Sequence, residues 1–76
     1  MKIDGSLIRD IDKNKNARNI VQTINTLAHK MGIETVAEQI ERREELEVIK
    51  HLGVSYAQGY FLGKPSFDFL DNVKGI

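Results

Sequence analysis

The sequence contains no cysteine, a single proline and no excess of charge of either sign. Because cysteine is absent, a disulfide framework and a thiolate metal site are both excluded. The 11 Lys and Arg residues balance the 11 Asp and Glu residues. A formal net charge of zero gives no bulk attraction to nucleic acid or to an anionic membrane, so we expect no nucleic-acid polymer among the partners.

Long hydrophobic runs are also missing, and the longest apolar stretches are far shorter than the roughly 20 residues that span a bilayer. Residues 1–6 lack the apolar core of a signal peptide. We therefore expect no membrane segment in this chain and a cytoplasmic, bacterial-type domain. A chain of 76 residues buries only about 60% of its unfolded surface, so its core is marginal if it folds alone.

The clearest periodic segment is residues 17–31, for which apolar spacing predicts an amphipathic helix. Asn16 is the predicted N-cap, and Gly32 suits the position after the last turn because glycine tolerates a positive φ. The predicted apolar stripe contains six residues: Ile20, Val21, Ile24, Leu27, Ala28 and Met31.

The remaining pattern predicts strands around this helix and a second helix. Residues 2–4 resemble the end of a strand, and residues 7–11 a helical turn capped by Ser6. The further expected elements are a strand at 33–40, a helix at 42–52, a strand at 54–62 that ends at 63–65, and a weakly helical or irregular tail from residue 66 onward.

The resulting order is β-α-β-α-β, which implies an α/β fold with parallel strands and right-handed crossovers. Either this is a very small α/β unit or it is part of a (β/α) barrel, since a complete barrel takes about 250 residues.

Three polar residues fall near the carboxyl ends of the predicted strands: Lys2, Glu38 and Gln58. Sites in parallel α/β folds are assembled at that rim. A lysine stabilises charge on a phosphoryl oxygen, a carboxylate binds a hard cation or orients water, and an amide holds a ligand or a coordinated water. The alternatives are a frayed terminal lysine and a solvated glutamate.

Two other local patterns carry expectations. Gly59, next to Gln58, indicates close approach of a backbone or a ligand. Glu44, Glu45 and Glu47 are interpreted as a solvated face of the second helix.

Four ordered motifs resemble the C-terminal part of the EAL domain, the bacterial cyclic-di-GMP phosphodiesterase family. The resemblance extends from residue 1 to about residue 66. The motifs are K-I-D-G-S-L-I (2–8), L-A-H-K-M-G (27–32), V-A-E-Q-I-E (36–41) and Q-G-Y-F-L-G-K-P (58–65).

The resemblance implies a TIM-like (β/α) barrel, of which residues 1–76 would be about the last third and residues 67–76 a weakly structured tail. It implies hydrolysis of cyclic-di-GMP to linear pGpG in the parent protein, with two divalent ions, Mg²⁺ or Mn²⁺, that activate a water. By motif position, Lys2, Glu38 and Gln58 are the implied catalytic residues, with Glu38 at the metals through water. Asp4 and Glu41 match supporting positions.

The sequence also departs from the family pattern. The E-A-L segment and the D-D pair that supply most metal ligands are absent. Gln39 stands where the family usually has glycine, and Arg42 where it usually has threonine. The glycine change bears on the loop after Glu38.

Three interpretations follow. The chain is a fragment of a cyclic-di-GMP phosphodiesterase, inactive alone; or a non-catalytic EAL-type module that binds cyclic-di-GMP or a protein partner; or a small unrelated α/β fold. A partial barrel exposes strand edges and apolar surface, so we expect a homo-oligomer or a barrel completed by a partner.

Overall fold

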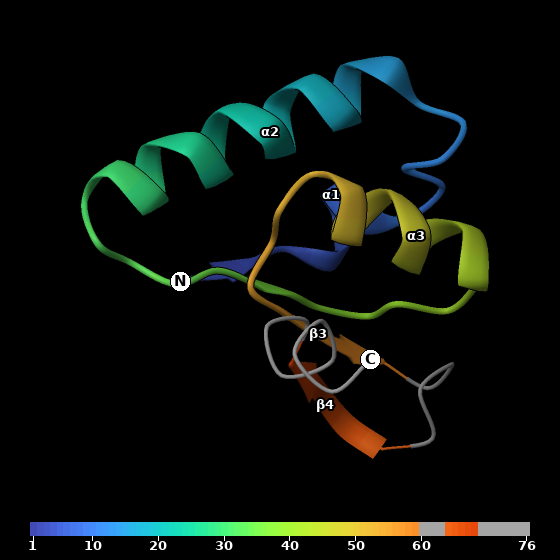
Figure 1. The fold of residues 1–76 in the computed structure, drawn as a ribbon. Coiled ribbons are helices and arrows are strands. Elements are labelled where there is room, and N and C mark those ends of the chain that lie inside the picture. The colour runs from blue at the N-terminus through green and yellow to red at the C-terminus, as the bar shows by residue number, and fades with distance from the viewer. Residues whose placement is uncertain (60–63, 69–76) are drawn as a thin grey trace.

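The computed structural model describes residues 1–59 and 64–68. Two helices of nine and sixteen residues alternate with short strands, and a four-residue helix follows the first strand (Figure 1). The elements are β1 (Lys2–Ile3), α1 (Gly5–Ile8), α2 (Lys15–Lys30), β2 (Val36–Ala37), α3 (Arg43–His51), β3 (Tyr56–Gly59) and β4 (Lys64–Asp68).

The strands form a single sheet in the order β1-β2-β3-β4. The pairs β1/β2 and β2/β3 are parallel, as the β-α-β-α-β pattern predicts. The prediction of an irregular or helical tail from residue 66 is wrong for residues 66–68, because β4 pairs antiparallel with β3. Residues 60–63 and 69–76, the ends of the predicted third strand and tail, lie outside the described residues.

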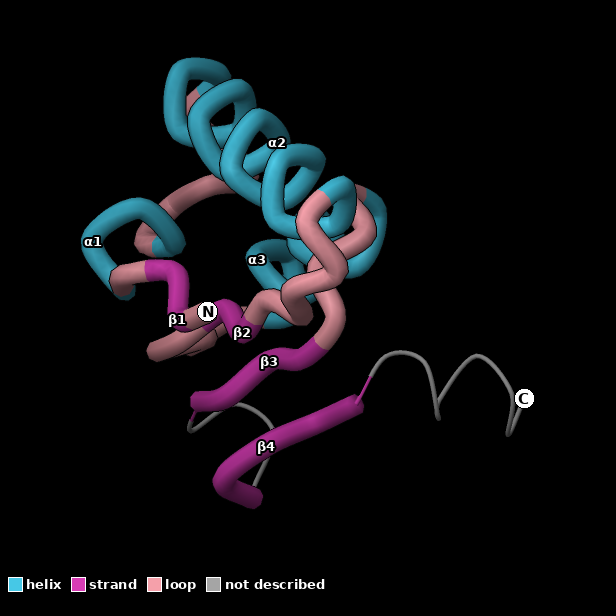
Figure 2. The backbone as a smooth tube through the Cα atoms, turned by 90° about the vertical axis from the view of Figure 1, so that its left-hand side faces the viewer, coloured by secondary structure: helices cyan, strands magenta, loops and turns pink. Residues whose placement is uncertain are grey.

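All three helices lie on one side of the sheet (Figure 2). Ile3, Ala37 and Ala57 are in register across the first three strands and are at most 2% exposed, so they form the face of the sheet that meets the helices. Side chains alternate between the two faces along a strand. Their sequence neighbours therefore point to the other face, which no described helix covers.

The start of α2 differs from the prediction by two residues. Asn14, not Asn16, is the N-cap, and its Oδ1 accepts a hydrogen bond from the Ala17 N–H at 3.1 Å. Ser6 does not cap α1 either: it lies inside that helix, and its hydroxyl donates to the Asp4 carboxylate.

The predicted apolar stripe of α2 is only partly buried. Val21 and Ala28 are in the core, whereas Ile20, Leu27 and Met31 are 46%, 59% and 64% exposed. The flank of α2 that carries these exposed side chains faces away from α3, because Asn25 on the other flank donates to the Leu52 backbone oxygen at the end of α3. The buried side of α2 includes the polar Asn25 as well as apolar residues. The spacing of apolar residues alone does not predict that a polar flank is buried.

A buried polar group joins α2 to the amino ends of β2 and β3. Asn25, Thr35 and Ser55 are all at most 5% exposed. The Thr35 hydroxyl donates to Asn25 Oδ1, and Thr35 and Ser55 exchange backbone-to-hydroxyl hydrogen bonds at 3.3 Å. These bonds satisfy polar atoms that would otherwise be buried without a partner, so they fix α2 over the sheet.

Within the residues that the structure describes, no helix is both long and apolar enough to cross a membrane.

Candidate functional site

Lys2 and Glu38 meet at the carboxyl end of the first two strands. Lys2 is in register with Val36, so Glu38, two residues further along, faces the same uncovered side of the sheet. The Lys2 Nζ lies 4.0 Å from Glu38 Oε2, with side-chain exposures of 69% and 32%. A cation and a carboxylate, both open to solvent, are thus available together at this rim.

Gln58 lies at the same rim on β3, two residues beyond Tyr56, which is in register with Val36. Its side chain is half-buried. Among the described residues, it hydrogen-bonds to neither Lys2 nor Glu38. Its backbone oxygen accepts from the Ile40 N–H at 2.8 Å, which ties the loop after β2 to β3.

Gly59 confirms the predicted close approach, here of a backbone. A Cβ at this position would lie 2.1 Å from the Ile40 backbone oxygen. Any larger residue would push the loop after β2 away from β3, so glycine is required for this loop to pass.

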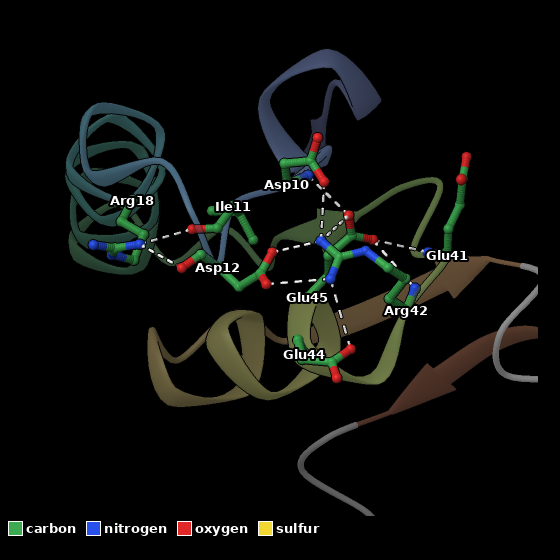
Figure 3. A network of polar contacts seen from close by, with 8 residues as sticks. All are labelled: Asp10, Ile11, Asp12, Arg18, Glu41, Arg42, Glu44 and Glu45. Carbon is green, nitrogen blue, oxygen red and sulfur yellow. Dashed lines mark hydrogen bonds and ion pairs between the residues drawn. The ribbon is translucent and has the colours of Figure 1, made fainter.

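The two supporting positions lie at the edge of the rim. Asp4 is exposed, directly follows β1, and accepts the hydrogen bond from Ser6. Glu41 is exposed and its side chain points away from Arg42 (Figure 3). Glu41 lies just ahead of α3, which starts at Arg43, and its backbone N–H donates to Glu45 Oε1 at 3.0 Å.

Arg42 is the centre of an ion-pair network that the sequence did not reveal. Its guanidinium contacts Asp12 at 2.6 and 3.2 Å, Asp10 at 3.0 Å, Glu45 at 3.3 Å and Glu44 at 3.6 Å (Figure 3). Asp10 and Asp12 belong to the loop after α1, so the network joins two loops at the carboxyl side of the sheet.

Glu45 is buried, which contradicts its predicted place on a solvated helix face. It is 2% exposed and accepts hydrogen bonds from the backbone N–H groups of Asp10, Glu41 and Arg42 at 2.8, 3.0 and 3.3 Å. Three backbone donors and a guanidinium replace the water that this carboxylate loses.

The charges in this network depend on one another. Burial raises the pKa of the Glu45 carboxyl, but the backbone N–H donors and the Arg42 charge outweigh it, so the pKa lies below its ordinary value. The hydrogen bond from Arg42 likewise lowers the pKa of Asp12, against the opposing effect of its desolvation. The same hydrogen bond raises the pKa of Arg42. All three groups are therefore charged near neutral pH.

The described residues do not complete a site for a divalent cation. Mg²⁺ takes six oxygen ligands in octahedral geometry, and the rim offers Glu38 next to a competing lysine. In the part of the chain that the structure describes, the three acidic residues close enough to share an ion are Asp10, Asp12 and Glu45, with ligand atoms within 4.8 Å of one another. The Arg42 guanidinium already forms ion pairs with all three of these carboxylates and takes the place that an ion would need.

Comparison with known proteins gives a coherent result. The family model described as EAL domain matches residues 1–65. The cyclic di-GMP phosphodiesterase PdeB of Shewanella oneidensis is 40% identical over 65 residues, which are 86% of this chain and 8% of PdeB. The cyclic di-GMP phosphodiesterase PdeF of Escherichia coli is 41% identical over 78 residues, which cover 100% of this chain and 10% of PdeF.

Solved structures share the fold. The EAL enzyme Bd1971, in its form bound to cAMP and cyclic-di-GMP, superposes with a TM-score of 0.78 at 40% identity, over 96% of this chain and 19% of that one. A manganese and cyclic-di-GMP complex of Klebsiella pneumoniae BlrP1 gives a TM-score of 0.76 at 32% identity, over 78% of this chain and 15% of that one. These matches confirm the predicted α/β unit of a TIM-like barrel. The chain spans a small part of each of these relatives.

Proposed function

We propose, since the chain belongs to the EAL domain family, that it supplies the Lys2–Glu38 part of an active site that hydrolyses cyclic-di-GMP. The observation that carries the proposal is the 4.0 Å contact between Lys2 Nζ and Glu38 Oε2 at the carboxyl rim of the sheet. The named relatives are cyclic di-GMP phosphodiesterases. The match to PdeF covers the whole chain and the family model covers residues 1–65, so both include Lys2 and Glu38.

In the proposed reaction, water attacks one phosphodiester phosphorus, one P–O bond breaks, and linear pGpG forms. Lys2 places its positive charge near the phosphate, where it stabilises the negative charge that grows in the transition state. Glu38 orients the attacking water, and Gln58 holds the ligand or the water from the next strand. Bound Mg²⁺ or Mn²⁺ would polarise the phosphate and make the water a stronger nucleophile.

The proposal requires groups that the described residues do not supply. Glu38 is the chain's contribution to a divalent-cation site, and further ligands must come from other strands of a complete barrel. We therefore expect the 76-residue chain alone to be inactive. Incubation of the purified chain with cyclic-di-GMP and Mg²⁺ or Mn²⁺ tests this expectation, and pGpG in those samples would contradict it.

The function itself is tested in a complete barrel. Residues 1–65 replace the matched segment of PdeF, and pGpG formation is measured with the native graft and with Glu38→Gln and Lys2→Ala variants. We expect the native graft to turn over and each variant to lose about 100-fold or more in kcat, as when one charge-stabilising group is removed from an active site.

Glu34→Gln is the matched control for Glu38→Gln. Glu34 is an exposed glutamate at the opposite end of β2, ahead of the strand. Its substitution should leave kcat unchanged. A native graft that binds cyclic-di-GMP without hydrolysing it would instead support the non-catalytic module.

A further inference from the structure

The segment that carries Glu38, residues 38–42, leaves β2 in a backbone conformation that needs external support. Gln39 has a φ of +62°, in the left-handed region that disfavours residues other than glycine. A non-glycine residue stays in this region only when its surroundings hold it there. Two hydrogen bonds to neighbouring strands support the first half: Glu38 N–H to the Ile3 oxygen at 3.4 Å and Ile40 N–H to the Gln58 oxygen at 2.8 Å.

The second half of the segment is held by charged side chains. Glu45 Oε1 accepts the N–H groups of Glu41 and Arg42, and the Arg42 side chain then reaches Asp10 and Asp12 (Figure 3). The Asp12 contact is bidentate, a geometry that fixes direction as well as distance. Residues 38–42 are thereby attached to the loop after α1, about 30 residues earlier in the chain.

We propose that Arg42 is a positioning residue for Glu38. By holding the end of the 38–42 segment against Asp10, Asp12 and Glu45, it keeps the Glu38 carboxylate at the rim beside Lys2. The catalytic meaning of this role rests on the proposed function, but the positioning itself does not.

The arrangement shows why an arginine suits this position. A threonine here could cap a helix through its own hydroxyl but could not reach Asp10 and Asp12. Arginine spans the gap and supplies the only charge that meets all three carboxylates of the group among the described residues. The local bond from the Arg42 N–H to Glu45 is retained, and the Arg42 side chain adds a longer tie between two loops of the rim.

A direct test measures how often Lys2 and Glu38 meet. A zero-length carbodiimide joins an amine and a carboxylate only when they are in contact, and mass spectrometry quantifies the Lys2–Glu38 amide bond in the full 76-residue chain. We expect Arg42→Thr to lower the yield about twofold, the change that a coupling at the low end of measured network couplings produces.

Arg43→Thr is the matched control, because Arg43 is the adjacent, exposed arginine. It should leave the yield unchanged. Asp12→Asn is a milder second variant that retains the fold if Arg42→Thr does not, with circular dichroism as the check of folding. A folded Arg42→Thr or Asp12→Asn chain with an unchanged yield would overturn the proposal.

The catalytic consequence is measured in the graft described above. Misplacement of a reacting group by about 1 Å costs up to about 100-fold in rate, so we expect Arg42→Thr to lower kcat about tenfold with KM nearly unchanged. Arg42→Lys, which retains the charge but not the bidentate geometry, should recover part of the loss. If Arg42→Thr loses the Lys2–Glu38 cross-link but the native graft is inactive, the positioning role of Arg42 stands and the proposed reaction is refuted. Loss of cross-linking with unchanged kcat would refute the catalytic role of the positioning.

Discussion

At the scale of single residues, the loop after Glu38 shows how a substitution is tolerated at a position that suits glycine. Gln39 adopts the left-handed conformation with a φ of +62°, and its side chain lies against Gly5. In the folded chain, the left-handed conformation costs a non-glycine residue about 1–2 kcal/mol. Glycine avoids that strain, but it lowers stability by about 0.4–1 kcal/mol because it gives the unfolded chain more conformational entropy. We therefore expect Gln39→Gly to raise the free energy of unfolding by about 0.5 kcal/mol.

The measurement is urea unfolding monitored by circular dichroism. Gly32→Ala provides the reverse case: Gly32 has a φ of +73° and nothing within 4 Å of an added Cβ. Its substitution should destabilise by about 1 kcal/mol through backbone conformation alone. A Gln39→Gly chain less stable than the native one would mean that the contact with Gly5 outweighs the backbone term.

The Arg42 network predicts how stability depends on pH. Asp12 and Glu45 have pKa values below their ordinary ones in the folded chain, so the unfolded chain binds more protons than the folded chain in acid. Their stabilising contribution is complete above the ordinary carboxyl pKa values near 4 and is lost as the pH falls below them. We expect a constant urea midpoint from about pH 7 to pH 5 and a decline below about pH 4.

Arg42→Thr separates this network from the other carboxylates. The variant should show a weaker decline in acid, whereas Arg43→Thr should follow the native profile. Equal slopes for the native and Arg42→Thr chains would show that the acid sensitivity arises elsewhere.

Residue types and strand ends allowed Lys2 and Glu38 to be placed together from the sequence, because parallel strands bring their carboxyl ends to one edge. Glu45 could not be distinguished from Glu44 in the same way. Both are charged residues in the first turn of α3, and what buries Glu45 is the loop after α1, more than 30 residues away. Long-range partners of that kind leave no local pattern.

At the scale of elements, the start of α2 has two asparagines, of which one caps the helix and the other does not. Asn14 accepts the Ala17 N–H, whereas Asn16 lies inside the helix and is exposed. Both residues are good caps by type, so the sequence alone could not choose between them. We expect Asn14→Ala to destabilise by about 1 kcal/mol and Asn16→Ala to have a much smaller effect, measured by urea unfolding. A larger loss for Asn16→Ala would reverse the assignment.

The strand β4 was missed for a different reason. Its second residue is Pro65, and the pattern at residues 63–65 predicts the end of a strand there. Proline lacks the N–H that a central strand needs, but an edge strand leaves one side without a partner. In the described sheet β4 lies at the edge, beyond β3, so the proline is compatible with pairing. The alternation of helices and strands in the sequence predicts parallel pairing of β1, β2 and β3. It does not predict that a further strand pairs antiparallel with β3.

At the scale of the whole molecule, the helical layer has one polar side and one apolar side. Towards α3, α2 presents groups such as Arg18 and Asn25 that hydrogen-bond to backbone oxygens of neighbouring segments. Away from α3, it exposes Ile20, Leu27 and Met31. With half-buried Ile24, these side chains have the 4-3-4 spacing of a helix–helix seam. In a complete barrel, that flank lies over the edge of β1, where another βα unit would pack.

This exposed seam identifies the surface through which we expect the chain to self-associate. We predict that the 76-residue chain associates through the α2 seam and that Ile20→Lys with Leu27→Lys raises the dissociation constant at least about tenfold, because charges replace the central apolar contacts. Sedimentation velocity over a concentration series measures the change. Thr23→Lys, on the same helix at an exposed polar position, is the control for added charge and should leave association unchanged. Assembly that persists in the double variant would instead place the contact at β1, the edge strand of the sheet that the described residues form, where another strand can bind. A chain that stays monomeric throughout the series would contradict both routes.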